Sequence, residues 1–133
     1  MKILVGYDAS DTAKEAMRLA KVDAKVYEAK VYLVTCITQV HEVKDQEMDR
    51  MRDADRELEI LKNEFDSEGI PSEVHLLVSN LEPGERLVQY AREIEADKIF
   101  IGVRRRSKVG KLIFGSTAQY VILEAPCPVV SVK

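Results

Sequence analysis

The sequence of 133 residues predicts an α/β fold in which strands and helices alternate along one domain, residues 1–133. Five short apolar segments have the length and composition of strands that are buried on both faces, at residues 2–7, 30–38, 72–78, 98–103 and 128–132. The segments between them carry helical signals, and this alternation favours parallel strands joined by right-handed crossovers. We therefore expect a three-layer, doubly wound sheet of five parallel strands, flavodoxin/Rossmann-like.

The first predicted strand, residues 2–7, ends before Asp8, and signals for the start of a helix follow at once. Thr12 and Glu15 have the spacing of a capping box, in which two side chains satisfy amide groups of the first helical turn. Small apolar residues then recur on one face of the predicted helix, namely Ala13, Ala16, Met17, Ala20 and Ala24.

The second predicted strand, residues 30–38, is rich in β-branched residues, and a long helix is predicted after it, from Lys44 to Ser67. About three heptads is short for a coiled coil, so we expect the apolar stripe of this helix to cover the sheet. Gly69 and Pro71 end the helix. The stripe comprises Met48, Met51, Ala54, Leu58, Leu61 and Phe65.

The third predicted strand, residues 72–78, precedes a helix whose first turn holds Pro83, a residue that suits the first helical position. Residues 98–103 form the fourth predicted strand, and residues 116–123 form a short helix. The segment from Pro128 to Val132 is the last strand. This strand is apolar and is expected at an edge of the sheet, where it invites pairing with a second copy of the chain.

The composition of the chain is that of a soluble globular protein, 46% hydrophobic and 32% charged. A net charge of -3 argues against bulk affinity for nucleic acid or for a membrane surface. No apolar run approaches the roughly 20 residues that a membrane helix needs. Cys36 and Cys127 lie in strand-like segments outside any Cys-x-x-Cys motif, which predicts reduced thiols and a cytoplasmic location.

The segment between Gly102 and Gly115 is basic, and it is the strongest candidate for a binding site. It leads through Ser116 into the predicted short helix. Amide groups at a helix N-terminus, hydroxyl groups beside them and nearby cations together hold anions. Ligands of open parallel sheets bind beyond the strand ends, where the strand order reverses. Asp8 and Ser10 are therefore expected to join this segment if the first and fourth strands are neighbours.

Four spaced motifs resemble those of the universal stress protein family: Tyr7-Asp8-Ala9-Ser10, Ala96 to Gly102, Gly115 to Gln119, and Ala125 to Val129. The resemblance covers essentially the whole chain. It implies a five-stranded α/β fold with strand order 3-2-1-4-5, and a homodimer formed through the last strand, here Pro128 to Val132. In one branch of the family it also implies ATP or AMP in the crevice at the strand ends.

The nucleotide-binding branch carries the motif Gly-x2-Gly-x9-Gly-[Ser/Thr], in which Gly102, Gly115 and Ser116 match the first glycine, the third glycine and the hydroxyl. Arg105 occupies the position of the second glycine. A side chain forced into a glycine-type positive φ costs about 1 kcal/mol. A guanidinium, in contrast, offers phosphate a charge-assisted hydrogen bond worth about 1.5 to 3 kcal/mol. Arg105, with Arg104 beside it, therefore either clamps a phosphate or blocks its site.

The candidate nucleotide-binding residues are Tyr7, Asp8, Ser10, Cys36, Ile37, Gly102, Arg104, Arg105, Gly115, Ser116 and Thr117. Asp8 would meet the ribose or a Mg²⁺ held by the phosphates, and Cys36 and Ile37 would line an adenine pocket. Each residue also has a structural interpretation: Asp8 as a cap or turn residue, Ser116 and Thr117 as N-cap residues, and Cys36 as core. We predict no catalytic residue and no metal-ligating cluster of histidines and cysteines.

Two functions remain open from the sequence. The leading hypothesis is a stress-response regulatory protein that binds ATP or AMP, with slow hydrolysis at most, because no general base is placed to activate water. The alternative is a dimeric interaction protein with an unidentified protein partner, in which Arg105 fills the phosphate space. The P-loop motif is absent, which argues against a P-loop NTPase. Nucleic-acid binding is disfavoured because no aromatic residue lies between Arg104 and Lys111 to stack on bases.

Overall fold

The computed structural model of the chain describes residues 1–42, 44–103 and 114–133, so Arg104 and Arg105 lie outside the described residues. It contains a five-stranded parallel sheet with the order β3-β2-β1-β4-β5, which confirms the predicted fold class and strand order. The elements in chain order are β1 (Lys2–Gly6), α1 (Asp11–Tyr27), β2 (Lys30–Thr38), α2 (Asp45–Ser67), β3 (Ser72–Ser79), α3 (Pro83–Ile94), β4 (Lys98–Gly102), α4 (Ser116–Glu124) and β5 (Val129–Val132).

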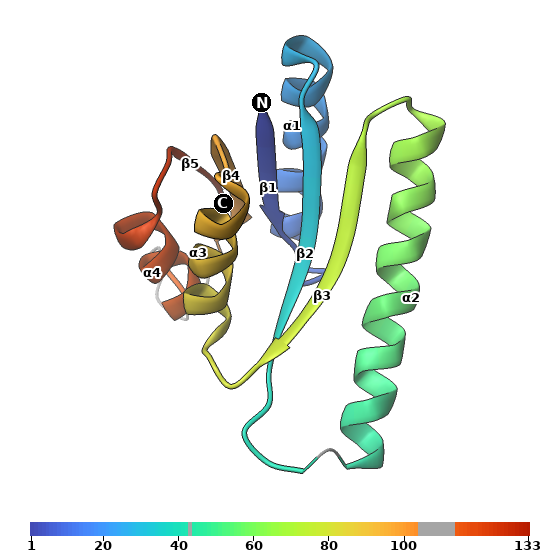
Figure 1. Cartoon of the computed structure of the whole chain (residues 1–133), viewed down its shortest axis with the longest axis vertical. Coiled ribbons are helices and arrows are strands. Elements are labelled where there is room, and N and C mark those ends of the chain that lie inside the picture. The colour runs from blue at the N-terminus through green and yellow to red at the C-terminus, as the bar shows by residue number, and fades with distance from the viewer. Residues whose placement is uncertain (43, 104–113) are drawn as a thin grey trace.

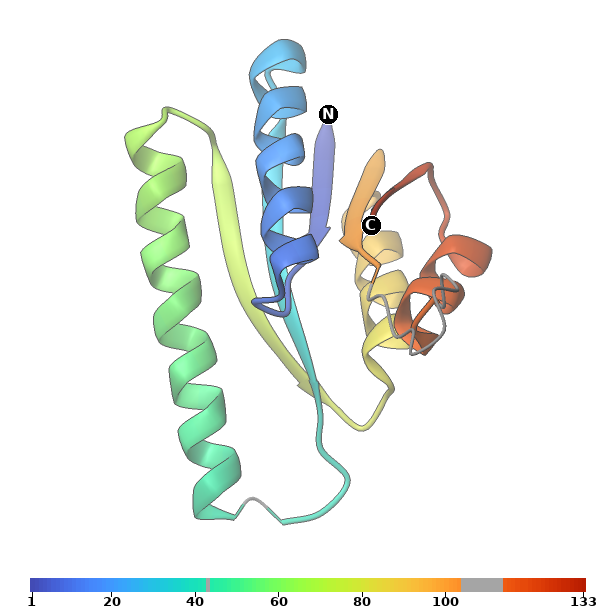
Figure 2. The same cartoon turned by 180° about the vertical axis from the view of Figure 1, so that it is seen from behind.

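Helices cover both faces of the sheet: α1 and α2 lie on one face, and α3 and α4 lie on the other (Figure 1 and Figure 2). Neighbouring residues of the central strands serve the two cores alternately. Val5 and Leu33 belong to the core under α1 and α2, whereas Leu4 and Val34 belong to the core under α3 and α4. All four side chains are fully buried. Burial on both faces explains why these strands are apolar throughout.

The start of α1 differs from the prediction, and the capping box expected at Thr12 and Glu15 is wrong. Ser10 is the N-cap, and its Oγ accepts a hydrogen bond from the amide of Ala13 at 3.2 Å. Thr12 lies inside the first turn and cannot cap it, because the turn that follows β1 already presents the Ser10 hydroxyl to the free amide groups. The predicted small apolar face is confirmed, since Ala13, Ala16, Met17, Ala20 and Ala24 are buried.

The second helix, α2, is longer than the strand beside it. Its 23 residues span about 35 Å, whereas the 8 residues of β3 span about 26 Å. The helix therefore extends past the carboxyl end of β3 (Figure 1). Its C-terminal half covers the sheet through Leu58, Leu61 and Phe65. For the N-terminal half the prediction of a sheet-covering stripe is wrong, because the side chain of Met48 is 48% exposed.

The strands β3 and β5 form the two edges of the sheet. The predicted edge position of the last strand is thus confirmed, and β5 pairs in parallel with β4, with Ile99 opposite Val129. Among the described residues, no helix combines the length and the apolar character that a membrane crossing requires.

Candidate functional site

A cavity of about 770 Å³ opens at the carboxyl ends of β1, β2 and β4. Because β1 lies between β2 and β4, this cavity marks the point at which the strand order reverses. Its volume falls within the range of small-molecule pockets, roughly 300 to 1,000 Å³. We call this cavity the crevice. The predicted residues that line it are Tyr7, Asp8, Cys36, Ile37, Gly102, Gly115, Ser116 and Thr117.

The turn between β1 and α1 forms one side of the crevice. Asp8 Oδ1 accepts hydrogen bonds from the Ser10 amide at 3.0 Å and from Ser10 Oγ at 2.5 Å. Ala9, between them, has a φ of 64°, a left-handed conformation that glycine adopts more easily than alanine. Asp8 therefore has the predicted turn role and also lines the crevice. The side chain of Ser10 is used within this turn and for the helix cap, and Ser10 is not among the lining residues.

Two threonines join the strand ends to neighbouring segments and so shape the floor of the crevice. Thr35 Oγ1 donates a hydrogen bond to the Tyr7 carbonyl at 2.9 Å, and Thr38 Oγ1 donates to the Leu81 carbonyl at 2.7 Å. Cys36 and Ile37 lie between them on β2. Burial raises the pKa of the Cys36 thiol to about 11, against a smaller opposing effect of the positive charge on Arg86. At neutral pH this thiol is protonated and contributes an uncharged wall.

The two motif glycines of the crevice have different surroundings. A Cβ atom on Gly102 would lie 2.5 Å from Thr12 Oγ1 and 2.6 Å from the Ala13 amide nitrogen. Gly102 is therefore needed for the close approach of α1 to the end of β4, whether or not a ligand binds. A Cβ atom on Gly115, in contrast, would meet no atom of the described residues within 4 Å, and this residue has an ordinary φ of -65°. As far as the described part of the chain is concerned, open space thus adjoins Gly115.

The start of α4 lies beside that open space. Gly115 is the N-cap, and no side chain among the described residues caps the first turn of this helix. Ser116 and Thr117 follow it, are exposed and line the crevice. Uncapped amide groups at a helix N-terminus carry partial positive charge and bind anions. The arrangement can therefore accept a phosphate or another anion.

The long helix α2 supplies part of the wall that the sequence did not indicate. Arg50, Ala54 and Glu57 line the crevice from this helix. The hydroxyl of Tyr7 donates a hydrogen bond to Glu57 Oε1 at 2.7 Å. Burial, together with this bond and the negative charge of Glu57, raises the pKa of Tyr7 well above its ordinary range. The positions 50, 54 and 57 share one helix face, but the sequence does not tell which neighbour that face meets.

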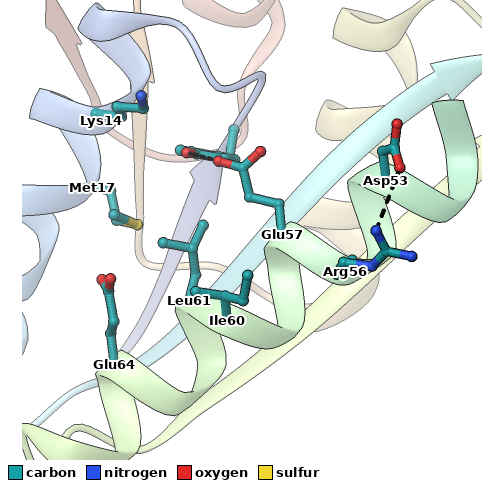
Figure 3. Close-up of a pocket in the computed structure, with 9 residues that line it drawn as sticks. Lys14, Met17, Asp53, Arg56, Glu57, Ile60, Leu61 and Glu64 are labelled. Atoms are coloured by element: carbon teal, nitrogen blue, oxygen red, sulfur yellow. Dashed lines mark hydrogen bonds and ion pairs between the residues drawn. The ribbon is translucent and has the colours of Figure 1, made fainter.

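A second cavity, of about 620 Å³, lies on the other side of the Tyr7–Glu57 bond, between α1 and α2. Figure 3 shows its side chains: Met17 and Leu61 form part of an apolar floor, and Lys14 and Glu64 stand at its rim. Tyr7 and Glu57 line both cavities, so one hydrogen-bonded pair separates them.

Comparison with known proteins agrees with this arrangement. The sequence profile of the Universal stress protein family matches residues 1–133. The chain belongs to this family. A universal stress protein of Thermus aquaticus, from the QAH/OAS sulfhydrylase 3' region, is 34% identical over 134 residues, which cover 98% of this chain and 97% of that protein.

Solved structures of the family have the same fold. A universal stress protein from Archaeoglobus fulgidus is 38% identical and superposes with a TM-score of 0.86, covering 100% of this chain and 98% of that one. A structure of the universal stress protein from the same organism in complex with dAMP is 34% identical, with a TM-score of 0.81 and the same coverage. Both likenesses extend over the whole α/β domain, including the strand ends that form the crevice.

Proposed function

We propose that this universal stress protein binds an adenosine nucleotide in the crevice and serves as a nucleotide-dependent regulator. The observation that carries the proposal is the space at Gly115, which no described residue fills, inside a cavity of about 770 Å³ and beside a start of α4 that no described side chain caps. The complex of the Archaeoglobus fulgidus protein with dAMP supports an adenine nucleotide as the ligand. AMP and ATP share the chemistry that such a crevice would recognise, namely adenine, ribose and phosphate.

Each part of the nucleotide has a counterpart among the lining residues. The amide groups of α4 and the hydroxyls of Ser116 and Thr117 would hold phosphate. The Asp8 carboxylate would accept from a ribose hydroxyl, or would bind Mg²⁺ when the phosphates carry one. The uncharged wall of Cys36 and Ile37 would receive adenine. These groups bind and orient a ligand, and we expect hydrolysis of ATP to be slow at most.

The alternative function, a dimeric interaction protein without nucleotide, has one observation in its favour. The described lining residues of the crevice include the carboxylates of Asp8, Glu57 and Glu82 and the guanidinium of Arg50. This excess of acidic groups opposes an anionic ligand unless the predicted cations Arg104 and Arg105 compensate for it.

Calorimetric titration separates the two functions. We expect saturable binding of AMP and of MgATP at physiological salt, which screens loose electrostatic attraction. Gly115→Ala places a methyl group in the open space without straining the backbone, so it should weaken AMP binding about tenfold or more while the protein stays folded. If neither nucleotide binds at millimolar concentration, the nucleotide proposal fails and the interaction protein replaces it. If Arg105→Gly increases ATP affinity, Arg105 blocks the phosphate site, whereas a decrease identifies it as a phosphate ligand.

We also propose that two copies of the chain pair through β5 and that the dimer works in the cytoplasm, where the free thiols of Cys36 and Cys127 stay reduced. The amides of Ile99 and Val103 bond to the carbonyls of Pro128 and Val132, so the alternate residue Ser131 directs its amide to the open edge. Ser131→Pro removes that outward donor and should convert a dimer into a monomer in gel filtration. A wild-type protein that elutes as a monomer would contradict the dimer.

A further inference from the structure

The N-terminal half of α2, from Asp45 to Glu57, is poorly packed against the rest of the molecule. All buried side chains of this helix lie after Glu57, at Leu58, Leu61 and Phe65. Met48 is 48% exposed, although its position continues the apolar stripe. Helical segments of about 12 residues are marginal in water without tertiary packing. This half of α2 should therefore open more readily than the half that follows it.

The same half of the helix forms a wall of the crevice. Arg50, Ala54 and Glu57 recur at intervals of four and three residues, which places them on one face, and all three line the cavity that Gly115 and Asp8 also line. Ala54 is small and leaves room beside the strand ends. Arg50 is the one guanidinium among the described lining residues, and it can bond to phosphate or to another anionic group.

One hydrogen bond anchors this wall. Among the residues that the structure describes, the bond from the Tyr7 hydroxyl to Glu57 Oε1, at 2.7 Å, is the only side-chain hydrogen bond between residues 45–57 and the rest of the chain. The described ion pairs of this half join residues within the helix itself, Arg52 with Asp49 and Arg56 with Asp53. The C-terminal half is additionally held by Lys21, which pairs with Glu68 at 2.7 Å.

We propose that a nucleotide in the crevice supplies the packing that the N-terminal half of α2 lacks, so that binding orders residues 45–57 with the Tyr7–Glu57 bond as their pivot. Arg50 is then a ligand-binding residue. The charged, solvent-facing side of residues 45–57 is the surface whose order depends on the bound nucleotide. This inference rests on the proposed nucleotide binding. By linkage, whatever stabilises this half of α2 also strengthens nucleotide binding.

Hydrogen–deuterium exchange of the full chain, with and without saturating AMP, tests the ordering. We expect the amides of residues 48–57 to exchange about tenfold more slowly when AMP is bound. The amides of residues 59–66, which are already packed, serve as the internal control and should change little. AMP binding without slower exchange in residues 48–57 overturns this inference and leaves the proposed function standing. An absence of AMP binding in calorimetry instead removes the proposed function, and this inference with it.

Two matched pairs of variants test the roles of Arg50 in AMP binding and of Tyr7 in anchoring α2. Arg50→Ala should weaken AMP binding about tenfold, whereas Arg52→Ala, on the same helix but outside the crevice lining, should leave it unchanged.

Tyr7→Phe should speed the hydrogen exchange of residues 48–57 about tenfold without ligand, because the bond to Glu57 is lost. Tyr32→Phe, at a buried tyrosine that lines neither cavity, should leave the exchange of these residues unchanged. Equal effects within either pair would contradict the assigned roles.

Discussion

Two of the helices that begin at the crevice, α1 and α4, satisfy their first amide groups in different ways. At α1, the Ser10 hydroxyl accepts from the Ala13 amide, Asp8 Oδ1 accepts from Ser10, and Gly102 lets β4 approach so closely that a Cβ atom there would lie 2.5 Å from Thr12 Oγ1. At α4, no described side chain caps the first turn, and no described atom would contact a Cβ atom on Gly115.

Within one crevice, the start of α1 therefore has mainly a structural role, and the start of α4 is open to a ligand. A capped and tightly packed helix start leaves fewer donors and less space for a ligand, so its capping and packing residues contribute mainly to stability. An uncapped start beside open space leaves amide donors for a partner of opposite charge. Two glycines of the same family motif thus serve different purposes, and variants of the two helix starts should have different effects on stability and on nucleotide binding.

The largest expected effect comes from Gly102→Ala at the packed start. The added methyl group would overlap backbone atoms of Thr12 and Ala13, which cannot move without displacing α1. We expect the free energy of unfolding to fall by about 3 kcal/mol in urea denaturation. A loss below about 1 kcal/mol would show that the contact between α1 and β4 relaxes easily, and the contrast with Gly115 would weaken.

Removal of the α1 cap should have the next largest effect. Ser10→Ala deletes the acceptor of the Ala13 amide and should lower the free energy of unfolding by about 1 kcal/mol. Thr12→Ala is the matched control, because Thr12 lies inside the first turn and does not cap it. If Thr12→Ala were the more destabilising of the two in thermal or urea unfolding, Thr12 and not Ser10 would be the capping residue, as the capping box predicts.

The turn before α1 offers a stabilising change of similar size. Ala9 has a φ of 64°, and Ala9→Gly should raise the free energy of unfolding by about 1 kcal/mol because glycine adopts that conformation without steric cost. The same substitution at Ala125, whose φ is -61°, should lower stability instead. A loss of stability in Ala9→Gly would show that the methyl group of Ala9 makes contacts worth more than the strain.

The smallest expected effect on stability is at the open start. Gly115→Ala should change the free energy of unfolding by less than about 0.5 kcal/mol. Restriction of the unfolded chain favours alanine, the N-cap position favours glycine, and the methyl group would meet no atom of the described residues. The same variant is expected to weaken AMP binding, so affinity would fall while stability stays nearly constant. A loss of more than about 2 kcal/mol in urea denaturation would instead indicate that the space is filled in the folded protein.

Much of this architecture could be predicted from the sequence. The five strands and the small apolar face of α1 follow from local periodicity and from the covering of both faces of a parallel sheet by helices. The strand order follows from the resemblance of the chain to its family. The approach of Asp8, Gly102 and Gly115 also follows, because the ends of parallel strands meet at one edge. The predicted roles of Arg104 and Arg105 lie outside the described residues and stay predictions.

The errors have a common physical origin. The capping box at Thr12 and the uniform stripe of α2 were both inferred from spacing along one element. Spacing does not report which side chain the preceding turn presents, nor how far a helix extends past its neighbouring strand. For the same reason, the sequence does not predict that Arg50 and Glu57 line the crevice. Spacing places them on one helix face but does not tell which part of the molecule that face contacts.

By itself, the sequence determined the fold class, through the period of its apolar residues and the alternation of strands and helices, and it determined the strand order through its family motifs. It also indicated the edge of the sheet at which a ligand would bind, because the carboxyl ends of parallel strands meet at one edge. Only the tertiary structure decided that Gly102 serves packing while Gly115 adjoins open space, and that Tyr7 bonds to Glu57 across the wall of two cavities. Such facts depend on distances between segments that are remote in the chain, and those distances exist only once the elements have packed.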